Sequence, residues 1–227
     1  MIKAFRKFFF AVVDILKEVN KDKKQSRYLY RWFTSLIHKN NSLEYELPWL
    51  TYESIDSIEK YLSKEMNVFE WGSGSSTIFF AKRVKRIISI EHDYDWYKKV
   101  TNHLRSKKLN KNAKVIYKKP IKIMSNKKRA NEEQEDYKNY SFKGYSSAIN
   151  KYPDRYFDLI LVDGRARINC IKLATKKIKK GGWIVFDNAD ADKYSKGIIN
   201  INSLDRLNFK GIGSFNSYSW LTTIFTM

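Results

Sequence analysis

The stretch Val68-Phe69-Glu70-Trp71-Gly72-Ser73-Gly74-Ser75-Ser76-Thr77 decides the fold of this 227-residue chain. Its first four residues predict the end of a strand, and the two glycines after them allow a sharp turn that brings the backbone close to a ligand. Residues 77–82 then predict a helix, for which Ser75 or Ser76 can serve as the N-cap. The amides at the start of that helix would face any ligand lying over the loop.

An acidic residue closes the next predicted strand, Arg86-Ile87-Ile88-Ser89-Ile90-Glu91, 19 positions after Gly72. A carboxylate about 20 residues beyond such a turn is placed to accept hydrogen bonds from a ribose diol. The loop has no third glycine and no Gly-Lys-Ser/Thr ending, which excludes a P-loop and disfavours a pyrophosphate-binding dehydrogenase. The sequence therefore predicts a β-loop-α-β unit that binds a nucleotide.

These residues resemble the class I S-adenosylmethionine-dependent methyltransferases, whose first motif is an acidic residue followed by G-x-G, here Glu70, Gly72 and Gly74. The resemblance continues through residues 156–164 and 179–188, which look like the fourth and fifth strands of that family. It implies an α/β fold: a Rossmann-like, doubly wound, mostly parallel seven-stranded sheet of order 3-2-1-4-5-7-6 with an antiparallel last strand. Residues 1–44 are expected to form an N-terminal helical appendage, broken near residues 21–25, and residues 45–227 the methyltransferase domain.

The resemblance also implies the cofactor, S-adenosylmethionine, and the residues that hold it. The glycine loop would cradle the aminocarboxypropyl arm, and Glu91 would hold the ribose hydroxyls. Tyr145 stands near the position at which related enzymes contact adenine. The cofactor-binding residues predicted in this way are Glu70, Gly72, Ser73, Gly74, Ser76, Glu91, His92, Tyr145 and Asp163.

Polar residues follow the fourth and fifth predicted strands, where Asp163 and the pair Asp187-Asn188 stand. Neighbouring parallel strands would bring these oxygens to one edge of the sheet, which suits a hard divalent cation such as Mg²⁺. The pattern resembles the metal-dependent small-molecule O-methyltransferases and predicts a metal site made of these three residues. Alternatively, Asp163 orders a loop and Asp187-Asn188 form a turn.

Asp163 and Arg165 are the predicted catalytic residues. Arg165 and Arg167 stand directly after the fourth strand, where guanidinium groups suit an acidic substrate or pair with nearby carboxylates. The interval 118–156 is long for a strand-to-helix connection and predicts a lid-like insertion. Four aromatic residues of that insertion could wall a pocket: Tyr137, Tyr140, Phe142 and Tyr145.

The net charge of +20 favours polyanionic partners such as nucleic acid or anionic lipid, although the lysines are spread along the chain and suit solvated helix faces. Residues 1–17 could lie on a membrane surface, or pack on the domain or on a second copy in a homodimer. Their apolar run is too short to cross a bilayer. The single cysteine, Cys170, excludes an intramolecular disulfide and fits a cytoplasmic protein.

The sequence thus predicts an O-methyltransferase acting on a small acceptor, such as an acidic molecule, a sugar or a glycan precursor. Two other classes stay open. A nucleic-acid methyltransferase is favoured by the charge, but Val162-Asp163-Gly164-Arg165 stands where amine-methylating enzymes carry N/D-P-P-Y/W. A noncatalytic polyanion-binding module on the same fold is the third class.

Overall fold

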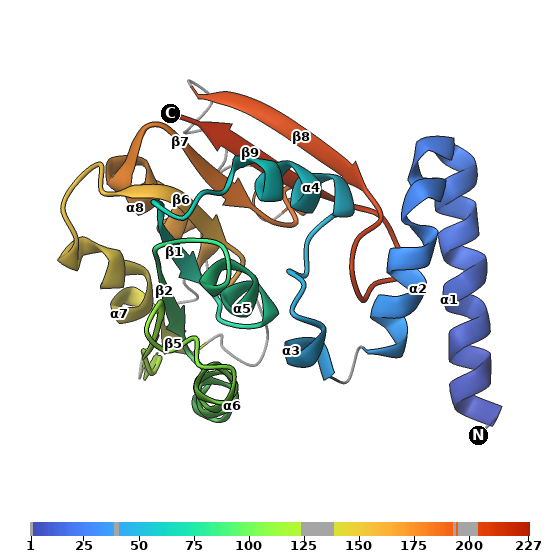
Figure 1. The fold of residues 1–227 in the computed structure, drawn as a ribbon, viewed down its shortest axis with the longest axis horizontal. Coiled ribbons are helices and arrows are strands. Elements are labelled where there is room, and N and C mark those ends of the chain that lie inside the picture. Colours follow the sequence, from blue (N-terminus) through green and yellow to red (C-terminus); the bar gives the residue numbers. More distant parts are fainter. Residues whose placement is uncertain (1, 39–40, 124–138, 193, 195–203) are drawn as a thin grey trace.

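The computed structural model describes residues 2–38, 41–123, 139–192, 194 and 204–227. A seven-stranded sheet in the order β3-β2-β1-β6-β7-β9-β8 forms its centre (Figure 1). The strands are β1 (Asn67–Trp71), β2 (Arg86–Glu91), β3 (Ala113–Tyr117), β6 (Phe157–Val162), β7 (Ile178–Phe186), β8 (Asp205–Gly211) and β9 (Trp220–Thr226). In this sheet β9 runs antiparallel to both of its neighbours, and the pairs from β3 to β7 are parallel. The predicted fold class and strand order are confirmed.

The central strands are apolar on both faces because helices cover both sides of the sheet. Alternate residues of β6 illustrate this: Leu159 and Leu161 belong to one buried cluster, and Ile160 and Val162 to the other. The first cluster includes side chains of α4 (Tyr52–Tyr61), α5 (Ser75–Ala81) and α6 (Tyr94–Ser106). The second includes α8 (Arg167–Lys177) and the short helices α7 (Lys143–Ser146) and η4 (Ser147–Lys151). The sheet is therefore doubly wound.

Helix α5 begins two residues earlier than the sequence predicted, and its N-cap is Gly74 rather than Ser75 or Ser76. The amide of Gly74 donates to Oγ1 of Thr77 at 2.9 Å. The hydroxyl of Ser76 turns instead toward a buried carboxylate, that of Glu70. The predicted cap was wrong because a buried acceptor competes for the serine hydroxyl, a contact that local sequence rules do not include.

The N-terminal segment forms α1 (Ile2–Lys21), η1 (Lys23–Tyr28), α2 (Leu29–Ile37) and α3 (Ser42–Tyr45), with the predicted break at the end of α1. Figure 1 shows α1 as the outermost helix, with α2 between it and the sheet. Polar contacts tie this segment to the connection between β8 and β9. Trp32 donates to the carbonyl of Asn216 at 2.6 Å, and Gln25 accepts from the amide of Ile212 at 3.1 Å. Among the described helices, none is both long and apolar enough to cross a bilayer.

The predicted insertion 118–156 is described in part. Its strands β4 (Ile121–Lys122) and β5 (Tyr140–Ser141) pair antiparallel, while residues 124–138, with Tyr137 among them, lie outside the described residues. Phe142 and Tyr145 are buried with β6 and α8 in the second cluster. That part of the insertion belongs to the core, and its role as a lid stays a prediction.

Candidate functional site

A cavity of about 510 Å³ lies at the carboxyl ends of β1, β2 and β6. This is the position at which doubly wound sheets bind ligands, and the volume is within the range of small-molecule sites. Its lining comes from the connections after these strands and from the N-terminal segment: Ser42, Trp49, Gly72, Ser73, Gly74, Ser75, Ser76, Glu91, His92, Asp93, Trp96, Asp163, Gly164, Arg165 and Arg167. Most of the predicted site residues therefore meet here, whereas Glu70, Tyr145, Asp187 and Asn188 lie outside this lining.

The two loops that form the floor of the cavity touch through glycines. Gly72 has φ +96°, and a Cβ on it would lie 2.9 Å from Cα of Gly164. A Cβ on Gly164 would lie 1.9 Å from the hydroxyl of Tyr145 and 2.9 Å from the amide of Gly72. Gly74 is different, since its φ of 174° is extended and only Trp96 would come within 4.0 Å of a Cβ. Gly72 and Gly164 are thus needed for packing, and Gly74 leaves space in the cavity.

Glu70 supports the loop from beneath. Its side chain is fully buried and accepts hydrogen bonds from three hydroxyls, those of Ser76, Thr77 and Ser89. Burial raises the pKa of Glu70 to about 7, against the lowering effect of these bonds. Glu70 was predicted as a cofactor contact, and the structure places it as a link between β1, α5 and β2.

The raised pKa of Glu70 predicts that the fold loses stability as the pH rises. An acid that keeps its proton in the folded state stabilises that state fully below its unfolded pKa, here 4.5, and the contribution disappears as the pH rises through about 7. A difference of this size corresponds to about 3 kcal/mol. We therefore expect the stability of the natural protein relative to Glu70→Gln to fall by about that amount between pH 4.5 and 7.5. Urea unfolding at several pH values measures this, and parallel pH profiles of the two proteins would contradict it.

Glu91 lies at the end of β2 with both carboxylate oxygens in the protein's own hydrogen bonds. Oε2 accepts from the amide and hydroxyl of Ser73 at 3.1 and 2.9 Å, and Oε1 accepts from the amides of His92 and Asp93 at 2.7 and 2.9 Å. Burial alone would raise the pKa of Glu91, but the bonds from His92, Asp93 and Ser73 bring it below its ordinary value. An anionic acceptor therefore lies on the cavity wall, where a ligand hydroxyl would compete with the hydroxyl of Ser73 for Oε2.

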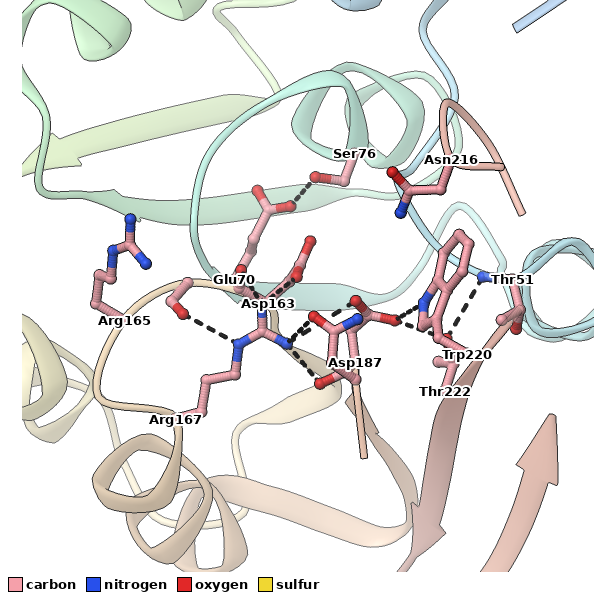
Figure 2. A network of polar contacts seen from close by, with 12 residues as sticks. Thr51, Glu70, Ser76, Asp163, Arg165, Arg167, Asp187, Asn216, Trp220 and Thr222 are labelled. Atoms are coloured by element: carbon pink, nitrogen blue, oxygen red, sulfur yellow. Dashed lines mark hydrogen bonds and ion pairs between the residues drawn. The ribbon is translucent and has the colours of Figure 1, made fainter. Parts of the chain in front are cut away.

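Asp163, Asp187 and Asn188 come together as predicted, but they converge on the guanidinium of Arg167 (Figure 2). Nη2 of Arg167 donates to Oδ1 of Asp163 at 2.8 Å, and Nη1 donates to Oδ1 of Asn188 at 3.2 Å and lies 3.8 Å from Oδ2 of Asp187. The described residues contain no group of three or more His, Cys, Asp or Glu side chains arranged to hold a metal ion. These residues do not fit the predicted metal, because a cationic side chain holds the place where it would bind.

Asp187 is fixed from the other side by β9. Its Oδ1 accepts from the indole of Trp220 at 2.8 Å and from the hydroxyl of Thr222 at 2.7 Å. Burial raises the pKa of Asp163 and of Asp187, and the nearby charge of Arg167 acts in the opposite direction. Among the described residues, no donor reaches Oδ2 of Asp163, so this oxygen is the one available to a ligand in the cavity.

Arg165 and Tyr145 lie on opposite sides of the cavity wall. Arg165 lines the cavity, and Figure 2 shows its side chain turned away from the cluster around Arg167. Tyr145 is buried, with its hydroxyl 3.4 Å from the amide of Arg165 and its carbonyl accepting from Trp71 at 3.1 Å. Tyr145 therefore supports the loop after β6 from behind the cavity wall.

Sequence reasoning missed two tryptophans and the contacts of Arg167. Trp96 lies in the first turn of α6 and donates to the carbonyl of Ser73 at 2.7 Å. A signal was present, since a helix that starts directly after β2 must place its first turn at this edge of the sheet. Trp49 reaches the cavity from the N-terminal side, and no local pattern indicates that.

Comparison with solved structures places this fold among methyltransferases. An O-methyltransferase from Bacillus cereus, solved with SAH, has a TM-score of 0.60 at 15% identity, over 93% of this chain and 100% of that one. An rRNA methylase from Streptococcus thermophilus has a TM-score of 0.53 at 12% identity, over 78% of this chain and 95% of that one. A tRNA (m1A58) methyltransferase from Aquifex aeolicus has a TM-score of 0.51 at 16% identity, over 79% and 71%. No family model and no curated protein matches the sequence. The chain therefore has the Rossmann-like fold of the class I S-adenosylmethionine-dependent methyltransferases.

Proposed function

We propose that the protein is an S-adenosylmethionine-dependent methyltransferase that methylates an oxygen of a small acceptor, such as an acidic molecule, a sugar or a glycan precursor. The observation that carries this proposal is the shared cavity of Gly74, Glu91 and Asp163. Gly74 leaves the floor of the cavity without a side chain, and Glu91 on its wall is an anionic acceptor for a diol. Asp163, which follows the neighbouring strand β6, adds a second carboxylate. The residues present fit the cofactor, and the solved O-methyltransferase of the same fold supports the choice of reaction.

The chemistry asked of the protein is mainly positioning and proton removal. Bound S-adenosylmethionine would supply a methyl group already activated by its sulfonium, so that an in-line approach of the acceptor is the main requirement. Asp163 is the proposed general base: its Oδ2 would take the proton of the acceptor hydroxyl, whose oxygen would bond to the methyl carbon while the methyl–sulfur bond breaks and S-adenosylhomocysteine leaves. Burial, which raises the pKa of Asp163, makes its carboxylate a better proton acceptor.

The preference for an acidic acceptor rests on Arg165. The five N–H donors of Arg167 have acceptors on the protein, so its guanidinium has none left for a substrate. Arg165 lines the same cavity and can form the bidentate contact that a carboxylate or phosphate favours. Trp49 supplies an apolar surface on the N-terminal side.

Replacing Glu91 tests the cofactor site. We expect Glu91→Ala to weaken S-adenosylmethionine binding by about 1–3 kcal/mol, because ribose hydroxyls would lose their charged acceptor. Isothermal titration calorimetry on the folded variant measures the change. The matched control is Glu59→Ala, which removes a surface carboxylate paired with Arg83 and should bind normally. Unchanged affinity in a folded Glu91→Ala protein would refute the assignment of Glu91 to the ribose.

A nucleic-acid methyltransferase is the second candidate, favoured by the net charge of +20 and by the rRNA and tRNA enzymes of the same fold. Binding to RNA measured between 50 and 200 mM salt separates the two, since contacts to many phosphates weaken affinity steeply over this range. Tight RNA binding that increases with bound cofactor would favour the second candidate. A protein that binds RNA but shows no measurable affinity for S-adenosylmethionine would instead be a noncatalytic polyanion-binding module.

A further inference from the structure

We propose that Arg167 is a built-in cation at this site, standing where a divalent metal would otherwise bind between Asp163, Asp187 and Asn188. The protein then needs no metal ion at this site. Loss of the guanidinium should convert the same three residues into a metal site.

The guanidinium of Arg167 has a hydrogen-bond acceptor for each of its N–H groups, which is more than a single ion pair. Nε donates to the carbonyl of Gly164 at 3.1 Å, and Nη2 donates to the carbonyl and Oδ1 of Asp163 at 3.0 and 2.8 Å. Nη1 donates to the carbonyl of Asp187 and to Oδ1 of Asn188. Five acceptors for five donors leave the guanidinium fully satisfied, which a buried charge requires.

The charges around Arg167 explain why a cation must be present. Arg167 is 8% exposed, and two carboxylates face its guanidinium: that of Asp187, which is buried, and that of Asp163, which is partly exposed to the cavity. The ring of Tyr194 lies 5.6 Å from Cζ of Arg167 and adds a favourable contact for a cation. Without Arg167, the two carboxylates would lie close together with no positive charge between them, and binding a divalent cation would relieve their repulsion.

Arginine suits this place better than lysine because its planar fork can bridge groups from two strands. Asp163 follows β6 and Asp187 follows β7, and Nη2 and Nη1 reach one each. A lysine ammonium has three donors and could satisfy at most three of these five acceptors. Arg167 is therefore also a positioning residue, which holds Oδ1 of Asp163 and leaves Oδ2 toward the cavity; this second role rests on the proposed function.

Manganese binding tests the inference without using enzyme activity. The probe is Mn²⁺ alone, titrated into the full chain and followed by the electron paramagnetic resonance of the free ion. The natural protein should bind no stoichiometric Mn²⁺ at this cluster, so that Asp187→Asn leaves its Mn²⁺ binding unchanged. Arg167→Ala should bind one Mn²⁺ at least about tenfold more tightly than the natural protein, and its melting temperature should rise by a few degrees when the ion is added.

Two controls make the result specific. Arg165→Ala removes the same charge from the same cavity but leaves the cluster of Asp163 and Asp187 intact, so its Mn²⁺ binding should equal that of the natural protein. Arg167→Ala combined with Asp187→Asn should lose the new site. Arg167→Lys keeps a positive charge between the carboxylates and should not bind Mn²⁺.

Three outcomes would overturn the inference. One is a stoichiometric Mn²⁺ site in the natural protein that disappears with Asp187→Asn. Another is a folded Arg167→Ala protein that binds Mn²⁺ no better than Arg165→Ala does. The third arises if Arg167→Ala unfolds: Mn²⁺ should then restore its circular dichroism spectrum, and failure of that rescue refutes the proposal. None of these Mn²⁺ results bears on the calorimetric test of cofactor binding with Glu91→Ala. The inference about Arg167 and the proposed function can therefore fail independently.

Discussion

Replacing Gly164 with alanine is expected to destabilise the fold by about 3 kcal/mol, the upper part of the usual range for overpacking. The new methyl group would lie 1.9 Å from the hydroxyl of Tyr145 and 2.9 Å from the amide of Gly72. The tyrosine could move, but the amide belongs to the loop after β1, so the backbone of the site must shift. Urea unfolding followed by tryptophan fluorescence measures the loss.

Gly144→Ala is the matched control for this substitution. No atom lies within 4 Å of a Cβ at Gly144, so the same change in composition should alter the stability little. Adding Tyr145→Phe to Gly164→Ala should recover part of the loss, since it removes the hydroxyl that the methyl group would meet. Equal stabilities of the two glycine variants would show that the loops after β1 and β6 are not in the close contact described above.

Valine at position 74 is expected to weaken S-adenosylmethionine binding by about 100-fold while leaving the fold intact. The φ of Gly74 is extended, and only Trp96 comes within 4.0 Å of a Cβ, so a branched side chain can be accommodated in the ligand-free protein. The same side chain would project into the cavity, where overpacking against a ligand costs about 1–3 kcal/mol. Calorimetric titration with the cofactor, together with a thermal melt, measures both effects.

Gly74→Ala provides a graded comparison and should lose less affinity than the valine variant. Alanine at Gly72 is not a suitable comparison for cofactor binding, because its Cβ would meet the backbone of Gly164 and disturb the fold itself. If a folded Gly74→Val protein binds the cofactor as the natural protein does, the cofactor does not cross the glycine loop, and the proposed function loses the observation that carries it.

Particular residues show how far the chain alone predicts this structure. The apolar strand before Gly72 and the acidic residue Glu91 at the end of the next strand are set by short-range patterns, and both lie where the sequence placed them. The break after α1 follows from a run of charged residues and is equally local. The prediction of Ser76 as a helix cap was wrong, and the burial of Tyr145 was not predicted, because tertiary contacts decide both. The hydroxyl of Ser76 turns to the buried carboxylate of Glu70, and the hydroxyl of Tyr145 lies against the loop at Gly164. Both contacts lie below the surface of the site and depend on how the elements pack.

The sequence by itself determined the doubly wound fold, the edge of the sheet at which the site lies and the meeting of Asp163 with Asp187 and Asn188. Those features follow because the carboxyl ends of parallel strands share one edge. Only the tertiary structure decided what lies between the three residues. The first turn of α8 points Arg167 back across the ends of β6 and β7, and β9 brings Trp220 and Thr222 to the far side of Asp187. Side-chain direction across three strands depends on how the helix and sheet pack, and this packing places the guanidinium of Arg167 between Asp163, Asp187 and Asn188.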